Sequence, residues 1–362
     1  MNLSTVQRIL GLMLMLFSLT MLPPVGVSFG YADGHWQPFL WSFLVIAAVG
    51  ALLWFPVRKA RRDLRLRDGF LVVAVFWLFL GFAGAAPFLI TDVPALSFTD
   101  AVFEAVSGFT TTGATVIVGI DSLPRSLLYY RQQIHWFGGM GIIVLAVALL
   151  PVLGIGGMSL FKAETPGPFK DQKLTPRITQ TAKALWGVYA ALTALCALLF
   201  WLAGMSAFDA IGHAFSALST GGFSTHDASF AHWDNAVIDA IATLFMFLGG
   251  ASFALHFIVL RGRDPRLYWR DTEFQAYFWL VLLVVLSVAV YLRIAGEFDS
   301  MAGSLRHSAF QVVAVQTSTG FLTTGFAHWP GAVPVLLMLL TFICGCAGST
   351  AGGMKVIRWL LV

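Results

Sequence analysis

Charge is scarce in this sequence. Only 11% of its 362 residues are Asp, Glu, Lys or Arg, whereas 58% are hydrophobic. A soluble domain needs more charge to cover its surface, so we expect lipid to be the solvent for most of the chain. A hydrocarbon layer about 30 Å thick requires roughly 20 apolar residues for each crossing helix. Apolar runs of about this length occupy residues 9–29, 36–55, 70–90, 184–204 and 276–294.

Cysteine is also rare, and nothing in its placement indicates disulfides. Cys196, Cys344 and Cys346 all stand in apolar surroundings, where free cysteines usually pack as small apolar side chains. The eight histidines are scattered, and we expect structural roles for them rather than metal binding. No nucleophiles, acids or metal ligands converge at a usable spacing, so we do not expect an enzyme.

A cleaved signal peptide is not expected either. The first apolar run lacks a small-residue cleavage site and is followed at once by another run, which favours a retained helix.

The net charge of +4 comes from basic residues gathered in blocks between the apolar runs. The positive-inside rule explains such blocks as cytoplasmic loops, without a nucleic-acid partner, and places the N-terminus in the cytoplasm. The blocks contain Arg58, Lys59, Arg61, Arg62, Arg65 and Arg67, then Lys162, Lys170, Lys173, Arg177 and Lys183, then Arg261, Arg263, Arg266 and Arg270.

Between basic blocks, the chain repeats one order of apolar segments: long, short, long. The short segments span residues 96–109, 207–218 and 305–315, and the first is followed by a long one at 134–153. About a dozen helical residues rise only about 18 Å, so a short segment must enter and leave the membrane on one face. Such re-entrant backbone lies inside protein or beside an aqueous cavity. The sequence therefore predicts one cavity shared by these segments.

The repeats match residue by residue when Gly113, Gly222 and Gly320 are aligned. Two places earlier stand Thr111, Thr220 and Ser318; nine places earlier stand the polar residues Glu104, His213 and Gln311. Every repeat starts from the same side, so the repeats are parallel. The predicted units are an extra helix pair at 1–68 and three helix–pore helix–helix repeats at 69–162, 163–270 and 271–362.

A Thr/Ser/Gly run follows each short helix. Glycine permits backbone angles that turn successive carbonyls toward one axis, and rings of carbonyls can replace the hydration shell of a monovalent cation. The short helices would also point their partially negative C-terminal ends at that cation. The alternative is that each run is a plain helix-capping turn. Three occurrences in register favour the cation pathway.

These loops resemble those of a known family. The segments S-G-F-T-T-T-G-A-T (residues 107–115), S-T-G-G-F-S-T-H-D (219–227) and Q-T-S-T-G-F-L-T-T (316–324) are similar to pore loops of the Trk/Ktr/HKT superfamily of potassium transporters. The resemblance is strongest to the bacterial TrkH/TrkG pore-forming subunits and covers essentially the whole chain. It implies an all-α polytopic membrane protein, with four parallel repeats around a pseudo-fourfold pore after an extra helix pair.

The resemblance also implies function. We expect potassium uptake across the bacterial inner membrane, a homodimer in the lipid bilayer, and a cytosolic nucleotide-binding regulatory subunit of the TrkA type. K⁺ would be the transported ion, with no organic cofactor, and Gly113 would favour it over Na⁺. Whether the chain acts as a symporter or a channel stays open, and three repeats rather than four lead us to expect a truncated chain. The filter positions carried over are Thr111, Thr112, Gly113, Thr220, Gly221, Gly222, Ser318, Thr319 and Gly320.

A glycine-rich stretch interrupts the last apolar segment. We interpret it as a broken helix that lies under the filter and gates it, as the matching segment does in the resembled family; the alternative is close helix packing through small residues. The proposed gate residues are Gly345, Gly348, Ser349, Thr350, Gly352, Gly353 and Lys355. For the small-residue runs at 138–141 and 154–157, close packing is the preferred interpretation.

Two further alternatives remain. Glu104, Asp100, Asp209 and Asp227 could form an acidic outer vestibule that concentrates cations, but helix capping explains Asp100 and Asp209 equally well. An alternating-access transporter is the main rival function. Its usual inverted repeats and intramembrane charges are not what this sequence shows.

Overall fold

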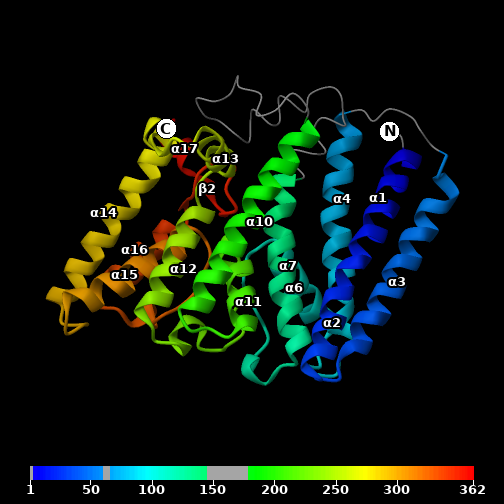
Figure 1. Cartoon of the computed structure of the whole chain (residues 1–362), viewed down its shortest axis with the longest axis horizontal. Coiled ribbons are helices and arrows are strands. Elements are labelled where there is room, and N and C mark those ends of the chain that lie inside the picture. The colour runs from blue at the N-terminus through cyan, green and yellow to red at the C-terminus, as the bar shows by residue number, and fades with distance from the viewer. Residues whose placement is uncertain (1–2, 60–65, 145–177) are drawn as a thin grey trace.

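The fold is a bundle of helices, seen side-on in the computed structural model of Figure 1. The structure describes residues 3–59, 66–144 and 178–362. Within these ranges, four helices are long and apolar enough to cross a membrane: Leu3–Tyr31, Trp36–Val57, Lys183–Leu202 and Thr272–Ile294. The expectation of a helical, multi-pass architecture is confirmed.

An N-terminal helix pair stands at one end of the bundle (Figure 1, blue). Its elements are α1 (Leu3–Ser18), η1 (Leu19–Met21), α2 (Leu22–Tyr31), α3 (Trp36–Trp54) and η2 (Phe55–Val57). The helices approach closely because glycines face each other: a Cβ atom at Gly11 would lie 2.7 Å from the Gly50 carbonyl oxygen. Prolines at the start of α2 account for the 3₁₀ turn before it.

The first repeat consists of α4 (Leu66–Gly84), α5 (Ala86–Ile90), α6 (Phe98–Phe109), η3 (Ile120–Ser122) and α7 (Arg125–Val144). The expected span at residues 70–90 is thus two consecutive helices, α4 and α5. The segment expected at 134–153 begins inside α7 and continues beyond the described residues.

The second repeat consists of α10 (Ile178–Leu202), α11 (Ala207–Leu218), η5 (Ser229–His232), α12 (Ala236–Gly249), α13 (Phe253–Gly262) and η6 (Pro265–Arg270). Its last crossing is broken, because α12 and α13 meet at 99°. We did not predict this break.

The third repeat consists of α14 (Thr272–Ile294), α15 (Met301–Gln316), η7 (Phe326–His328), α16 (Val333–Leu340), β1 (Ile343–Cys344), β2 (Met354–Lys355) and α17 (Val356–Leu360). The strands β1 and β2 pair in parallel. The predicted interruption of the last apolar segment is present, since α16 ends at Leu340. In Figure 1, α4, α10 and α14 all begin at the upper edge, where α1 also begins, so the repeats run parallel.

The short helices α6, α11 and α15 each begin with the same kind of N-terminal cap, a serine. The hydroxyls of Ser97, Ser206 and Ser300 each accept a hydrogen bond from the backbone N–H three residues later. α6 and α11 have 12 residues each, whereas α15 has 16 and so begins about one turn earlier. One serine cap therefore starts each re-entrant helix.

Candidate functional site: the pore loops and the segment beneath them

The short helices end in one unusual backbone conformation. Thr111, Thr220 and Ser318, the residues two places before the aligned glycines, adopt φ of 54°, 52° and 57°. This left-handed region is uncommon for any residue other than glycine, and most unusual for β-branched residues such as the two threonines. Each conformation is supported by its own side chain, because each hydroxyl donates to the preceding carbonyl oxygen at 2.6–2.7 Å. The three loops thus start alike.

The aligned glycines add a second left-handed residue to each loop. Gly113, Gly222 and Gly320 have φ of 75°, 87° and 80°. Plain capping turns would need only one such residue, at the helix end. Each loop instead has two, separated by one residue of ordinary φ, so the three loops share a backbone conformation that helix capping alone does not require.

Neighbouring loops meet at these glycines. A Cβ atom on Gly113 would lie 2.0 Å from the Gly221 carbonyl oxygen, and one on Gly222 would lie 1.8 Å from the Thr319 carbonyl oxygen. No side chain fits at either position. The first loop therefore packs against the second and the second against the third. A Cβ on Gly320 would meet nothing within 4 Å among the described residues, so the third loop is open on its corresponding side.

Hydroxyls support the loops from within. The Thr112 and Thr319 hydroxyls lie 2.8 and 2.7 Å from those of Thr110 and Thr317, two residues earlier. Gly221 packs against the imidazole of His135 on α7, where a Cβ would lie 2.2 Å from Nδ1. All nine predicted filter residues therefore belong to one continuous arrangement of three loops.

The polar column nine places before the glycines braces the loops from behind. In the second repeat, His213 Nε2 lies 2.9 Å from the Ser224 hydroxyl. In the third, Gln311 Nε2 lies 3.3 Å from the Thr323 hydroxyl. Glu104 in the first repeat bonds to the Thr115 hydroxyl and accepts the Val116 N–H at 2.7 Å. The sequence showed this column but gave no reason for it. In the structure, each of these side chains attaches the segment that follows the aligned glycine to the short helix before it.

Residues 345–353 lie directly against two filter loops. The Gly352 N–H donates to Ser318 Oγ at 2.8 Å. The Thr350 hydroxyl donates to the Leu218 carbonyl oxygen at 2.9 Å and lies 3.3 Å from Thr220 Oγ1. The predicted gate residues thus lie beside the predicted filter loops; in Figure 1 this end of the chain is red, near the labels β2 and α17.

This segment also fills the break between α12 and α13. The Cys346 N–H donates to the Gly250 carbonyl oxygen at 2.8 Å, and the Phe253 N–H donates to the Gly348 carbonyl oxygen at 3.1 Å. A Cβ at Gly345 would lie 2.3 Å from the Gly250 oxygen. The backbone groups freed where the α12–α13 crossing breaks are therefore satisfied by the third repeat, as buried backbone requires.

The other predicted gate residues hold the segment's own shape. The Ser349 hydroxyl donates to the Cys346 carbonyl oxygen at 2.6 Å, and Lys355 Nζ donates to the Ala351 carbonyl oxygen. Gly348 and Gly353 have φ of 76° and 64°. These turns fold the segment back so that β2 pairs with β1.

Comparison with known proteins identifies the chain. Residues 35–362 match the family model described as "TrkH: Cation transport protein". The chain belongs to the TrkH family. It is 53% identical to the Trk system potassium uptake protein TrkH of Halomonas elongata, over 100% of this chain and 75% of that protein. It is 41% identical to TrkG of Escherichia coli, over 99% of this chain and 73% of that protein.

A solved TrkH-family structure is similar along the whole chain. The crystal structure of the potassium transporter TrkH from Vibrio parahaemolyticus superimposes with a TM-score of 0.90 at 50% identity. The match covers 100% of this chain and 74% of that one. The similarity therefore includes the three pore loops and the segment beneath them.

One buried basic residue of this TrkH-family chain has a structural role that we did not predict from the sequence. Arg131 on α7 is fully buried. Its guanidinium lies 3.7 Å from Glu104 Oε2, donates to the Thr115 hydroxyl at 3.1 Å, and stacks on the Phe223 ring at 4.2 Å. Arg131 thus ties α7 to the first and second filter loops. The sequence did hold a signal for this role, because Arg131 is among the few basic residues outside the basic blocks.

A second missed residue is Glu273, at the start of α14. Its buried Oε1 atom accepts the Ala347 N–H at 2.8 Å and the Ile357 N–H at 3.1 Å. One carboxylate oxygen therefore holds both ends of the glycine-rich segment. A glutamate in the first turn of a helix is commonly explained by its favourable interaction with the helix dipole, so the sequence offered no signal for this role.

The four acidic residues considered for an outer vestibule differ in their surroundings. Glu104 is completely buried and belongs to the brace, which corrects its expected place. Asp100 and Asp209 each accept a hydrogen bond from their capping serine, at 2.7 and 2.6 Å, in favour of the capping alternative. Asp227 is exposed at the rim, where its N–H donates to Asp121 at 3.1 Å.

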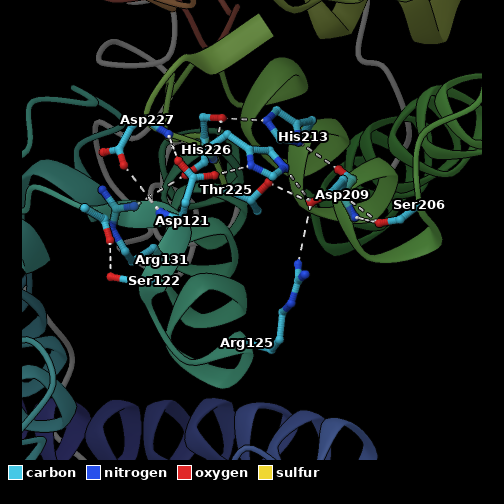
Figure 2. Close-up of polar contacts among 12 residues, drawn as sticks. Asp121, Ser122, Arg125, Arg131, Ser206, Asp209, His213, Thr225, His226 and Asp227 are labelled. Atoms are coloured by element: carbon cyan, nitrogen blue, oxygen red, sulfur yellow. Dashed lines mark hydrogen bonds and ion pairs between the residues drawn. The ribbon is translucent and has the colours of Figure 1, made fainter. Parts of the chain in front are cut away.

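Figure 2 shows this rim, where loops of the first and second repeats meet. Asp121 accepts hydrogen bonds from the His226 ring and from the Asp227 N–H. Partial burial raises the pKa of Asp121, but these hydrogen bonds outweigh burial and lower it below its ordinary value. The Asp121 carboxyl is therefore ionised at neutral pH.

The small-residue run at 138–141 packs as expected in its first half. A Cβ at Gly138 would lie 2.1 Å from the Phe109 carbonyl oxygen, and one at Gly139 would lie 2.8 Å from the Ser219 Cβ. α7 thus touches the ends of two pore helices. The run at 154–157 lies outside the described residues.

Proposed function

We propose that this chain takes up potassium through a filter of backbone carbonyls, as the pore-forming subunit of a Trk-type system. The carrying observation is the packing of three loops, each with two left-handed residues, against one another. The names of the relatives, Trk system potassium uptake proteins, support K⁺ as the cation. Ion movement through such a filter needs no covalent chemistry, so we assign no catalytic residue.

The filter ligands in this proposal are main-chain oxygens. The hydroxyls of Thr111, Thr220 and Ser318 are already engaged with the preceding carbonyls. Main-chain carbonyls would then supply the ligands, and their number and dipole strength favour a large dehydrated cation such as K⁺. The ion-binding residues are those expected from the sequence: Thr111, Thr112, Gly113, Thr220, Gly221, Gly222, Ser318, Thr319 and Gly320.

We further propose that residues 345–353 form the gate. The segment is attached to the filter loops by hydrogen bonds from Thr350 and Gly352, and to α14 through Glu273. Its dense glycine content allows the backbone to move without side-chain obstruction. Opening would withdraw it from beneath the second and third loops.

The proposed setting is the bacterial inner membrane, with the N-terminus in the cytoplasm. Arg261 lies in the last turn of α13, and Arg263 and Arg266 follow it before α14, on the edge of the bundle where α1 begins (Figure 1). Such basic clusters mark cytoplasmic loops. The Trk-system names of the relatives support association with other components. We propose a homodimer and a cytosolic nucleotide-binding regulatory subunit on this basic face.

The test is ion flux in liposomes that contain the full-length protein, for wild type and Gly113→Ser. The serine Cβ would displace the Gly221 carbonyl that lies 2.0 Å away, so we expect the K⁺/Na⁺ permeability ratio to fall about tenfold or more, equivalent to about 1.4 kcal/mol. Gly119→Ser is the matched control. Gly119 has the same φ of 75° in the same repeat, but a Cβ atom there would lie 3.5 Å from its nearest neighbour, the Ser122 Oγ atom.

Both variants carry the same backbone strain, so the difference between them isolates the filter contact. A monodisperse size-exclusion profile shows that each variant is folded. Unchanged selectivity in folded Gly113→Ser would remove this glycine from the filter and contradict the proposal.

A further inference from the structure

Three potential metal ligands meet at the rim of the pore loops. They are Asp121 in η3 of the first repeat, His226 in the loop between α11 and η5, and His232 at the end of η5. One ligand atom from each lies within 4.8 Å of the others. Figure 2 shows Asp121 and His226 side by side, reaching across from different repeats. The spacing of these residues in the sequence gave no sign of a cluster.

The ligand types suit a particular class of ion. Two imidazoles and one carboxylate form a mixed nitrogen–oxygen set that is typical of Zn²⁺ and related divalent transition metals. K⁺ and Mg²⁺ prefer oxygen ligands and would gain little from the two rings. With three protein ligands, a fourth position stays open to water, as in zinc sites that are not purely structural.

Hydrogen bonding alone leaves part of this cluster without a partner. His226 Nδ1 contacts Asp121, but the buried Nε2 atom of the same ring has no hydrogen-bond partner; the nearest carboxylate oxygen, of Asp209, is 3.6 Å away. A buried ring nitrogen without a partner is costly unless something else binds it. A metal ion on one nitrogen would let the other donate to a carboxylate, the usual arrangement around metal-bound histidine.

The two rings are placed for a small rearrangement. They stack with centroids 3.6 Å apart and planes 7° from parallel. Imidazole lone pairs lie in the ring plane, so both rings can bind one ion only after one of them turns about its Cβ–Cγ bond. His232 is exposed, and this torsion is broad for histidine. Binding would therefore reorient the His232 ring and leave the backbone in place.

We propose that Asp121, His226 and His232 bind a divalent transition-metal ion of the Zn²⁺ class. The ion would cross-link the loops that leave the first and second filters. His226 lies only a few residues after Gly222, so the cross-link fixes the rim beside the filter. The site does not depend on the proposed ion selectivity, and it binds metal whether or not the chain conducts K⁺.

Isothermal titration with ZnCl₂ tests this, using full-length protein in detergent after removal of any histidine tag and chelator. Wild type is expected to bind one ion with a saturable isotherm. His232→Ala removes an exposed ligand, and Asp121→Asn keeps the hydrogen-bond acceptor shape while removing the anionic ligand. Each is expected to weaken binding by about tenfold or more, the scale seen when groups around a metal are removed.

His328→Ala is the matched control. Like His232, His328 ends a 3₁₀ helix after a filter loop and precedes a tryptophan, but it is not part of the cluster. Its isotherm should equal that of wild type. Adding Zn²⁺ should also raise the melting temperature of wild type and of His328→Ala but not of His232→Ala. Absence of saturable binding, or equal affinity in all four proteins, would overturn the proposal.

Discussion

The filter loops and the glycine-rich segment beneath them are both irregular backbone inside a helical bundle, yet they are held differently. The filter loops interlock through main-chain contacts at Gly113 and Gly222, where no side chain fits. The segment at 345–353 is attached by separate hydrogen bonds, partly main-chain bonds to the α12–α13 break and partly bonds from the side chains of Thr350 and Glu273. In the proposed function, separate hydrogen bonds can break and form again in a second arrangement, which suits a gate, whereas the interlocked glycines suit a fixed filter.

The largest expected effect comes from breaking the filter's charged brace with Arg131→Met. Glu104 would stay buried without its guanidinium partner, and losing one partner of a buried pair costs about 3–5 kcal/mol. We expect a lower melting temperature of the full-length protein in detergent, together with reduced K⁺/Na⁺ selectivity.

The double variant Glu104→Gln/Arg131→Met separates charge from shape. It leaves no unpaired charge, so most of the lost stability should return. The neutral brace of the third repeat offers a contrast, because Gln311→Met should cost only about 1 kcal/mol. Equal losses at Arg131 and Gln311 would show that the brace does not act through charge.

The next effect concerns the gate's anchor. Glu273→Leu leaves the Ala347 and Ile357 N–H groups buried without an acceptor, at about 1–3 kcal/mol each. The segment should detach, and basal ion flux through liposomes should rise without a change in K⁺/Na⁺ selectivity. Glu273→Gln keeps an acceptor oxygen in place and should behave nearly as wild type. Loss of selectivity in Glu273→Leu would mean that the two regions are not held separately.

The smallest expected effect comes from Thr350→Val, which keeps the shape of the side chain and removes its hydroxyl. The Leu218 carbonyl loses one donor, a change of about 1 kcal/mol, so we expect basal flux to rise roughly fivefold. Ser349→Ala is the control, since the Ser349 hydroxyl bonds only within the segment, to Cys346. A larger rise in Ser349→Ala than in Thr350→Val would place the attachment elsewhere.

Much of the fold was predictable because membrane-crossing helices appear in the sequence as long apolar runs, and repeats appear as recurring motifs. The segment expected at 207–218 is α11, Ala207–Leu218. The third short helix, expected at 305–315, extends from Met301 to Gln316, because its first turn contains Ser304 and is capped by Ser300, which an apolar pattern does not register. The aligned glycines could be found in the sequence because all three adopt a left-handed φ, which favours glycine at the same place in every repeat.

The attachments between repeats could not be predicted in the same way. Glu104 lies on a short helix and Arg131 on the helix that follows it, and the two side chains meet only in the folded chain. Glu273 bonds to Ala347, which is 74 residues away in the sequence. Each is a polar residue whose partner depends on how helices pack, and no periodicity encodes that. The break between α12 and α13 was missed for the same reason, since its freed carbonyls are satisfied by residues of the third repeat.

The most direct test of the central claim is anomalous scattering from Tl⁺, a K⁺ analogue, in crystals of the full-length protein. The account predicts anomalous density on the pore axis, level with the carbonyl oxygens of Thr111, Thr220 and Ser318. Displacement of that density by excess K⁺, but not by the same concentration of Na⁺, would agree with dehydrated coordination of a large cation. Tl⁺ density confined to other sites, with none between these three loops, would contradict it.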